Sequence, residues 1–280
     1  MDTRLIFCSD VHLCHIDWYE RSSADRMDNM INKLNEYYKE NPYEKIMFLG
    51  DYSLDFWTWD ICGSYLREGV NNAENFVKNY ASKLIAPYHM MPGNHEQYGN
   101  EKWEQITGVK RDGSFVAGGY LIIASDNFSG ILDPDFHSDG EYSPTKLDFV
   151  KGEMEKYPDL PVILCSHYFD ETKEPPEFFE FLKNEKRIVF LICGHDHIID
   201  VTSFGEKADN VKLFHDGHYS YAGGGRSPKD IMWGFCEAVL KEDGVDIKYV
   251  EPENSIVIDG EVHNHSYREQ LHTFFKRRDI

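Results

Sequence analysis

The chain has 280 residues, enough for one large domain or two small ones. Hydrophobic side chains make up 41% of these residues, which is sufficient for a sizeable core. Acidic residues outnumber basic ones by 49 to 29, and the formal net charge of −20 argues against nucleic acid as the main partner, because phosphate backbones bind to positive surfaces.

The cysteines and the apolar runs predict a soluble, cytoplasmic protein. Cys8, Cys165 and Cys193 lie within or at the end of strand-like apolar runs, as is typical of buried thiols in a reducing compartment. The N-terminal residues enter a strand at once, without the pattern of a signal peptide. No apolar run approaches membrane-spanning length, so we expect no membrane partner. No feature of the sequence indicates a partner protein or an oligomeric state.

The first part of the chain alternates strand and helix patterns. Residues 4–9 and 45–49 are apolar runs typical of buried strands, and apolar residues at helical spacing lie between them. Ser22 and Asp25 form a capping box at the start of that helix. This order predicts a βαβ unit. The next expected elements are a helix over residues 72–84, a strand over 88–91 and a hairpin of strands over 114–116 and 120–124.

The second part begins with another helix. Ser143 and Pro144 predict its N-cap and its first residue, and it should run to about residue 157. The elements expected next are strands over residues 161–165 and 188–193, with a helix over 175–184 between them. The pattern then changes to strands over residues 201–204, 211–215, 231–240 and 245–250. We therefore predict one α/β domain over residues 1–250.

Residues 251–280 are expected to form a C-terminal appendage that packs on this domain. The appendage should contain a short strand over residues 256–258 and a final helix over 267–278. The sequence contains no internal repeat and no low-complexity linker that would mark a second domain.

Side chains able to bind metal follow five of the predicted strands. The five motifs are Asp10-x-His12, Gly50-Asp51, Gly93-Asn94-His95-Glu96, Ser166-His167 and Gly194-His195-x-His197. Open α/β sheets place their sites at the carboxyl ends of their strands, so we expect these side chains to meet there. Taken singly, most of these histidines would be structural or surface residues, and it is their joint occurrence at strand ends that predicts a site.

The donors in these motifs favour two metal ions over one. They comprise two carboxylates, one carboxamide and four imidazoles, with His95 as a fifth imidazole. Such donors suit Mn²⁺, Fe²⁺ or Fe³⁺, Zn²⁺ and Ni²⁺, and they do not determine which of these metals binds. Seven donors exceed the needs of one ion, and Asp51 can bridge two ions because a carboxylate has two oxygens with spare lone pairs. Two ions ~3.5–4 Å apart clamp a phosphoryl group and hold a hydroxide between them.

Taken in order, the motifs resemble those of the calcineurin-like metallophosphoesterase superfamily over residues 4–250. The resemblance implies a four-layer α/β/β/α sandwich of two mixed sheets, with two metal ions (Mn, Fe or Zn) at the carboxyl-edge loops. The first ion would be held by Asp10, His12, Asp51 and His197. The second would be held by Asp51, Asn94, His167 and His195. The resemblance also implies that Asp51 and His95 act in catalysis, with His95 assisting the leaving group.

Differences between this sequence and the motifs of related families limit the class of substrate. Residues 50–55 resemble a sequence motif of the protein Ser/Thr phosphatases but lack the arginine of that motif. Pro92 stands where those enzymes carry another arginine. We therefore expect no phosphoprotein substrate. Leu54 stands where purple acid phosphatases place a tyrosine, which argues against a tyrosine-ligated ferric site. The remaining group is the bacterial-type phosphoesterases, which include cyclic-nucleotide phosphodiesterases and small-molecule phosphatases.

An aromatic loop favours a small phosphodiester or a nucleotide as the phosphate-ester substrate. Trp57 and Trp59 either pack onto the core or stack on a base. The candidate substrate-binding residues are Asn94, His95, Trp57, Trp59 and Arg226. Arg226 follows a glycine run without the strand-to-helix context of a phosphate cradle.

The alternatives are a small-molecule phosphomonoesterase, a nuclease and a non-catalytic interaction module on the same fold. The negative charge disfavours the nuclease, and the complete set of ligands disfavours the interaction module. Asp55 is expected to be a solvated carboxylate rather than an acceptor for a metal ligand. His218 has no matching context and is expected to be a surface or core residue.

Overall fold

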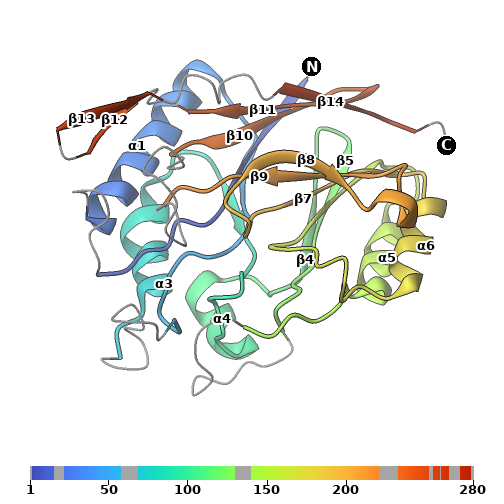
Figure 1. The fold of residues 1–280 in the computed structure, drawn as a ribbon, viewed down its shortest axis with the longest axis horizontal. Helices are drawn as coiled ribbons and strands as arrows, with labels where there is room; N and C mark the ends of the chain where they lie inside the picture. The colour runs from blue at the N-terminus through green and yellow to red at the C-terminus, as the bar shows by residue number, and fades with distance from the viewer. Residues whose placement is uncertain are drawn as a thin grey trace.

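The computed structural model describes residues 2–15, 22–57, 69–129, 140–220, 233–251, 255–258, 260–264 and 272–278. Two six-stranded mixed sheets pack against each other in this part of the chain, and helices cover their outer faces (Figure 1). The predicted α/β/β/α sandwich is therefore confirmed. Among the described helices, none combines the length and the apolar composition needed to cross a bilayer.

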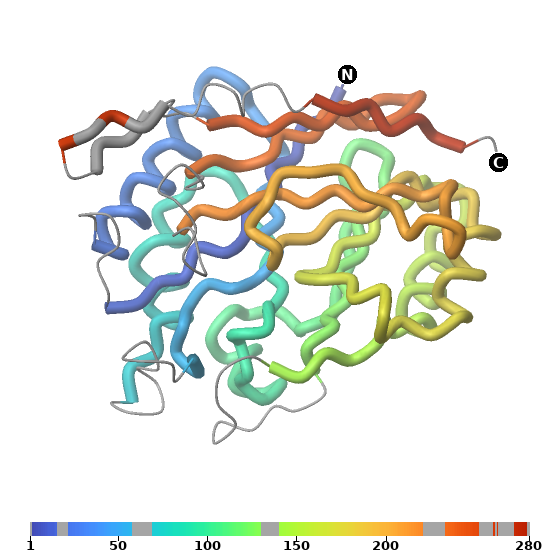
Figure 2. The backbone as a smooth tube through the Cα atoms, in the orientation of Figure 1, coloured from blue at the N-terminus to red at the C-terminus, as the bar shows by residue number. Residues whose placement is uncertain are grey.

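The first sheet contains strands from both ends of the chain, in the order β14-β11-β10-β1-β2-β3. Its parallel part is formed by β1 (Thr3–Cys8), β2 (Lys45–Phe48) and β3 (Tyr88–Met90). Its antiparallel part is formed by β10 (Phe235–Leu240), β11 (Gly244–Val250) and β14 (His272–Lys276). Figure 2 follows the chain from the blue N-terminal strand to the red strand β14 of the same sheet.

The second sheet has the order β4-β5-β6-β7-β9-β8. The parallel strands are β5 (Tyr120–Ala124), β6 (Val162–Cys165), β7 (Ile188–Cys193) and β9 (Lys212–Asp216). The antiparallel edges are β4 (Gly113–Ala117) and β8 (Ile199–Ser203). Every residue of β6 and β7 is buried, as expected for parallel strands covered on both faces.

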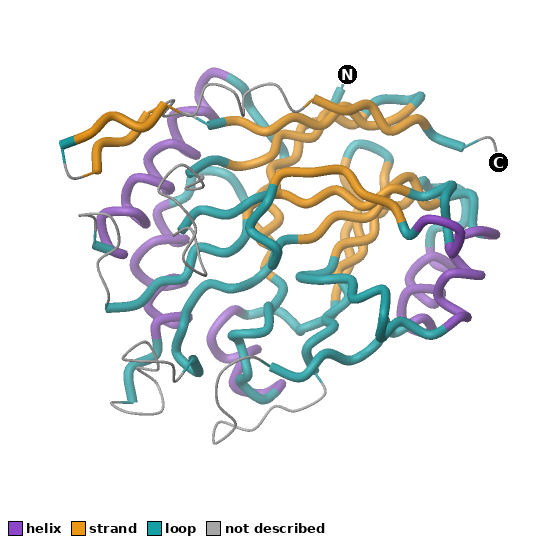
Figure 3. The backbone as a smooth tube through the Cα atoms, in the orientation of Figure 1, coloured by secondary structure: helices purple, strands orange, loops and turns teal. Residues whose placement is uncertain are grey.

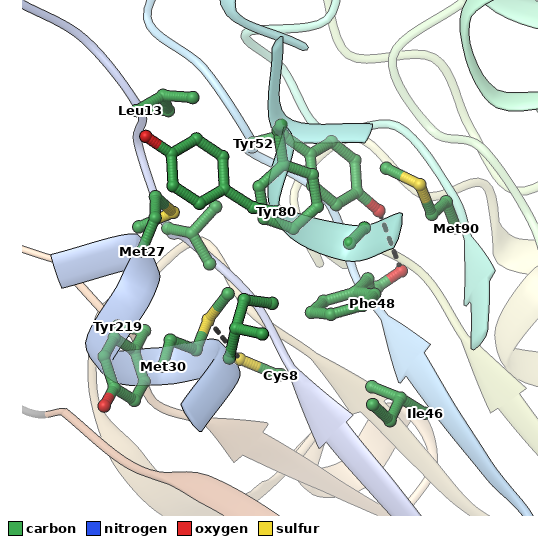
Figure 4. Close-up of a cluster of buried hydrophobic side chains, with 14 of the residues drawn as sticks. Cys8, Leu13, Met27, Met30, Ile46, Phe48, Tyr52, Tyr80, Met90 and Tyr219 are labelled. Carbon is green, nitrogen blue, oxygen red and sulfur yellow. Dashed lines mark hydrogen bonds between the residues drawn. The ribbon is translucent and has the colours of Figure 1, made fainter. Parts of the chain in front are cut away.

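Three apolar clusters correspond to the three spaces between the four layers. One lies between α1 (Ser23–Glu40) and the first sheet, where Cys8 packs on Met30 (Figure 4). The second lies between the sheets, and the third lies under α5 (Leu147–Lys156) and α6 (Pro176–Asn184). Figure 3 shows the helices in purple on opposite sides of the two sheets.

The local signals of the first helices are largely confirmed. Ser22 caps α1 by accepting the N–H of Asp25 at 3.0 Å. The helix predicted over residues 72–84 is an irregular helical segment made of α3 (Asn72–Asn75), a π-helical turn (Phe76–Tyr80) and a 3₁₀ turn (Ala81–Lys83). Two further helical segments were not predicted, namely α4 (Asn100–Thr107) and a 3₁₀ turn (Gly205–Lys207).

The predicted start of the next helix at Ser143 is wrong, because α5 begins at Leu147. The Ser143 N–H donates to the carbonyl of Asn127 at 2.8 Å, and the Thr145 N–H donates to the Glu174 carboxylate at 3.0 Å. These tertiary bonds use N–H groups that a helix start would otherwise present, and the segment lies outside the helix.

The predicted final helix is also wrong where the structure describes it, because His272–Lys276 form strand β14. Phe275 lies in the core between the sheets, and its ring stacks on Phe190 of β7 at a centroid distance of 4.4 Å. The buried stack and the pairing with β11 outweigh local helix preference. The predicted strand near residue 256 is β12 (Ser255–Ile258), and it forms a hairpin with β13 (Glu261–Asn264).

Candidate metal centre

The predicted ligands converge at the carboxyl ends of the parallel strands. In each of three groups of side chains, one ligand atom per residue lies within 4.8 Å of the others. The groups are Asp10, His12 and His197; His12, Asp51 and His95; and Asp51, His167 and His195. Because His12 and Asp51 each belong to two groups, the three groups form one continuous cluster.

One part of the cluster, here called the first half, contains Asp10, His12 and His197. His197 Nε2 lies 3.1 Å from Asp10 Oδ1, and His12 Nε2 lies 3.7 Å from the same oxygen. Asp10 and His12 follow β1, whereas His197 follows β7. The first half therefore joins loops from both sheets.

The second half contains Asn94, His167 and His195. Asn94 Oδ1 lies 2.9 Å from His167 Nε2 and 2.9 Å from His195 Nδ1. Asp51 stands between the halves, since its Oδ2 lies 3.2 Å from His12 Nε2 and 3.2 Å from His167 Nε2. This is the place that a bridging carboxylate would occupy.

Hydrogen bonds orient two of the imidazoles towards the cluster. His167 Nδ1 lies 2.8 Å from the carbonyl oxygen of Leu49, which can only accept, so Nδ1 carries the hydrogen and Nε2 faces Asp51. His12 Nδ1 lies 3.2 Å from Ser220 Oγ, and its Nε2 faces the cluster. One nitrogen of each ring is thus held by the protein, as in metal-ligating histidines.

The backbone is left-handed at five of the predicted ligands. These residues are Asp10, His12, Asp51, His195 and His197, with φ values from 47° to 67°. Among the described residues, no other non-glycine residue has a positive φ. A left-handed φ is unfavourable for side chains with a β-carbon, and such strain concentrates at functional sites. The surrounding fold therefore holds these loops in place.

Glu96 ties the loops after β2 and β3 together. Its Oε2 accepts the N–H groups of Asp51 at 2.8 Å and of Gly93 at 2.9 Å, and its Oε1 accepts the N–H of Tyr52 at 2.9 Å. A β-carbon at Gly93 would lie 2.1 Å from Asp51 Oδ1, so only glycine fits there. Burial and the charge of Asp51 raise the pKa of Glu96 to about 8. The motif at residues 93–96 predicts no role for Glu96, although this residue directly follows Asn94 and His95.

His95 belongs to the cluster but to neither half, and it lies next to Trp57. Its Nε2 is 3.7 Å from Asp51 Oδ2, and its ring meets the His12 ring edge-on at 5.4 Å. The Trp57 ring lies 5.8 Å from the His95 ring. Of the other predicted substrate-binding residues, Asn94 belongs to the second half, whereas Trp59 and Arg226 lie outside the described residues.

Three side chains that the sequence motifs do not predict at the site contact the predicted ligands. The Tyr168 ring lies 4.5 Å from the His195 ring, and the Phe128 ring lies 5.8 Å from the His167 ring. His218 is buried and stacks on His197 at 4.7 Å. Tyr168 directly follows His167 in the sequence, which was an available signal, whereas Phe128 and His218 reach the site only through the fold.

Asp55 differs from its expectation, because it is fully buried rather than solvated. Its carboxylate accepts the backbone N–H of Asn72 at 2.6 Å, the side-chain amide of Asn72 at 2.8 Å and the hydroxyl of Tyr98 at 2.6 Å. Burial raises the pKa of Asp55 against these hydrogen bonds. Asp55 therefore holds the start of α3.

The electrostatics of the cluster favour a cation. Burial by itself would raise the pKa of Asp51, but His167 and His95 outweigh it and hold that pKa well below its ordinary range. Burial lowers the pKa of His12 and of His195 to about 4. Burial also disfavours a charge on His167, but Asp51 and Asp10 raise its pKa to about 10. Among Asp10, Asp51, His12, His167 and His195, two carboxylates thus face one imidazolium, and metal ions fit this excess of negative charge.

A sequence model of the calcineurin-like phosphoesterase family matches residues 3–198, well over half of the chain. A search of curated proteins found no match.

Two of the solved structures that match this chain illustrate the shared fold. A purple acid phosphatase from yellow lupin (Lupinus luteus) is 13% identical with a TM-score of 0.58, over 94% of this chain and 53% of the lupin chain. GAP50, described as the anchor in the inner membrane complex of Plasmodium, is also 13% identical with a TM-score of 0.58, over 99% of this chain and 90% of the GAP50 chain. This chain thus spans about half the length of the phosphatase.

Proposed function

The chain belongs to the calcineurin-like phosphoesterase family of metal-dependent phosphoric ester hydrolases, and from this we propose that it cleaves a small phosphodiester or nucleotide at a dinuclear metal centre. The observation that carries the proposal is the position of Asp51 Oδ2, 3.2 Å from a histidine of each half. A single mononuclear site would need only one of the two halves.

The ligand assignment that we propose follows the two halves. Asp10, His12 and His197 would hold one ion, and Asn94, His167 and His195 would hold the other, with Asp51 shared. Two such ions lower the pKa of water and neutralise charge on a phosphoryl group. Mn, Fe and Zn all suit these oxygen and nitrogen donors.

His95 is the proposed general acid. It belongs to the cluster but to neither half, and its Nε2 lies 3.7 Å from Asp51 Oδ2, the oxygen that stands between the two halves. A proton on Nε2 can pass to the leaving-group oxygen. Asn94 would add an amide donor for a phosphoryl oxygen.

Trp57 supports a substrate that contains a base. Its ring lies 5.8 Å from the His95 ring and is partly exposed, so its face can stack on a base. Replacing Trp57 by Ala should raise KM for base-containing substrates by roughly tenfold or more and leave KM for a simple aryl phosphodiester unchanged. An equal change for both substrates would remove the argument for a base.

The first experiment compares hydrolysis of a chromogenic phosphodiester and its phosphomonoester analogue, each with Mn²⁺ and with chelator. We expect turnover that requires metal and is faster with the diester. A preference for the monoester would instead support the alternative, a small-molecule phosphomonoesterase. Absence of turnover with either substrate, in folded and metal-loaded protein, would favour a non-catalytic interaction module. The complete set of predicted ligands argues against that module.

We place this activity in the cytoplasm. The five described cysteines are buried free thiols, as expected in a reducing compartment.

The substrate would be a small phosphate ester. The division of the chain into a domain over residues 1–250 and an appendage over residues 251–280 stays a prediction.

A further inference from the structure

A buried arginine lies behind the first half of the cluster. Arg26 of α1 has 0% of its surface exposed. One guanidinium nitrogen, NH1, donates to the carbonyls of Val11 at 3.0 Å and Tyr219 at 3.1 Å. The other, NH2, donates to the carbonyl of His12 at 3.3 Å and to Ser23 Oγ at 3.0 Å. Arg26 therefore joins α1 to two loops beside the cluster.

The first of these loops is the strained turn that carries two predicted ligands. Asp10 and His12 have φ values of 52° and 47°, and Val11 lies between them. The two terminal nitrogens of the guanidinium bind two carbonyls of this turn at once, those of Val11 and His12. A lysine could not reproduce this, because its single ammonium group lacks the planar fork.

The second loop, at Tyr219 and Ser220, contacts both the Asp10–His12 turn and the ring of His12. The Tyr219 N–H lies 3.3 Å from the carbonyl oxygens of Ser9 and Asp10. The next residue, Ser220, has its hydroxyl 3.2 Å from His12 Nδ1. By holding the carbonyls of Val11, His12 and Tyr219 together, Arg26 fixes both the backbone and the ring direction of His12.

We propose that Arg26 is a positioning residue that sets the metal affinity of the first half by holding the Asp10–His12 turn in its left-handed conformation. The proposal rests on the proposed two-metal centre. It predicts an effect confined to the first half, whereas a merely structural arginine would affect both halves or neither.

Arg111 provides a matched control in the second half. It is also buried, and it donates to Asp126 Oδ2 at 2.7 Å and to the carbonyls of Glu96 at 2.9 Å and Tyr98 at 2.8 Å. The loop it holds carries Asn94 but contains no left-handed residue. Arg111→Lys therefore tests what the loss of a buried arginine does without a strained turn.

The experiment measures Mn²⁺ binding by calorimetry in the full chain, in backgrounds that retain one half each. His195→Ala disables the second half, and His197→Ala disables the first. We expect Arg26→Lys to weaken Mn²⁺ binding roughly 10- to 100-fold in the His195→Ala background, as for other outer partners of metal ligands. In the His197→Ala background the affinity should not change. Arg111→Lys should leave the affinity in the His195→Ala background unchanged.

Equal weakening in both backgrounds, or unchanged affinity in the His195→Ala background, would overturn the proposal. If Arg26→Lys does not fold, Ser23→Ala is used instead, because it removes one acceptor of the guanidinium. It should weaken Mn²⁺ binding in the same background, by a smaller factor. No selective effect of that variant would then overturn the proposal. If the wild-type chain binds no Mn²⁺, the two-metal centre is overturned together with the role of Arg26. If the wild-type chain binds two Mn²⁺ ions but the Arg26 variants show no selective loss of affinity in the first half, only the role of Arg26 is overturned.

Discussion

The two halves of the proposed metal centre are built in different ways. In the first half, Asp10, His12 and His197 all sit on left-handed backbone. In the second half, only His195 does, while Asn94 and His167 have ordinary conformations. The comparison indicates that the first half depends on the fold to hold unfavourable turns, whereas the second half depends more on side-chain hydrogen bonds such as that of His167 with Leu49.

Asp51→Asn should have the largest effect, because Asp51 belongs to both halves. Asparagine keeps the shape of the side chain but removes its charge, so we expect both Mn²⁺ sites to bind more weakly. Turnover should fall by more than about 100-fold, which exceeds the effect of removing a residue that only hydrogen-bonds a metal ligand. His197→Ala should lose one ion of the two. Metal analysis and the chromogenic assay measure both quantities, and two bound ions with wild-type turnover in Asp51→Asn would contradict the bridging role.

His95→Asn tests a residue outside both halves. If His95 is the general acid, turnover should fall by about 10²- to 10⁴-fold. Metal content should stay at the wild-type value, because His95 is not a proposed ligand. Loss of an ion in this variant would show that His95 belongs to the metal centre itself, and the assignment of the two halves would have to change.

Glu96→Gln tests the connection between the loops of Asp51 and Gly93. Each oxygen of Glu96 accepts backbone N–H groups, so the amide nitrogen of glutamine would face a donor wherever it is placed. We expect a loss of about 1–3 kcal/mol in the free energy of unfolding, measured with denaturant. The exposed Glu180→Gln serves as the control and should change it by less than about 0.5 kcal/mol. Equal stability of both variants would mean that Glu96 does not hold these loops.

The smallest effect is expected at His89 of β3, which is outside both halves. Burial, with a contribution from Lys45, lowers the pKa of His89 from 6.5 to about 4. As the pH falls, the unfolded chain therefore protonates His89 at a higher pH than the folded chain does. The contribution of neutral His89 to the free energy of unfolding is complete above pH 6.5 and is lost as the pH falls towards 4. His89→Phe, beside Phe115, should reduce the loss of stability between neutral and mildly acidic pH by about 1–2 kcal/mol. Parallel pH profiles of the two proteins would contradict this.

The site could be predicted from the sequence because its ligands stand directly at strand ends. Each of the five motifs follows an apolar run, and parallel strands bring their carboxyl ends to one edge. The supporting residues could not be predicted in this way. Arg26 belongs to a helix pattern, and its contacts with Val11 and Tyr219 exist only after α1 has packed on the first sheet.

The same reason explains the errors in the fold. Ser143 is a good local N-cap, but Asn127 and Glu174 bind the backbone around it. The tail near Phe275 has local helix preference, but pairing with β11 and stacking on Phe190 decide its conformation. In both places a distant partner outweighs a local signal, and a single sequence does not show the partner.

Strand β14 also affects how the chain can assemble. It is the last of the described strands in sequence, yet it covers the edge of β11, and its Phe275 packs between the two sheets. Until residues 272–276 have been synthesised and docked, β11 presents an unpaired edge and Phe190 lacks its stacking partner. An open strand edge recruits other chains, so the nascent protein passes through a stage that is prone to aggregation. A short deletion at this strand should therefore reduce the yield of folded protein even though it leaves every proposed ligand in place.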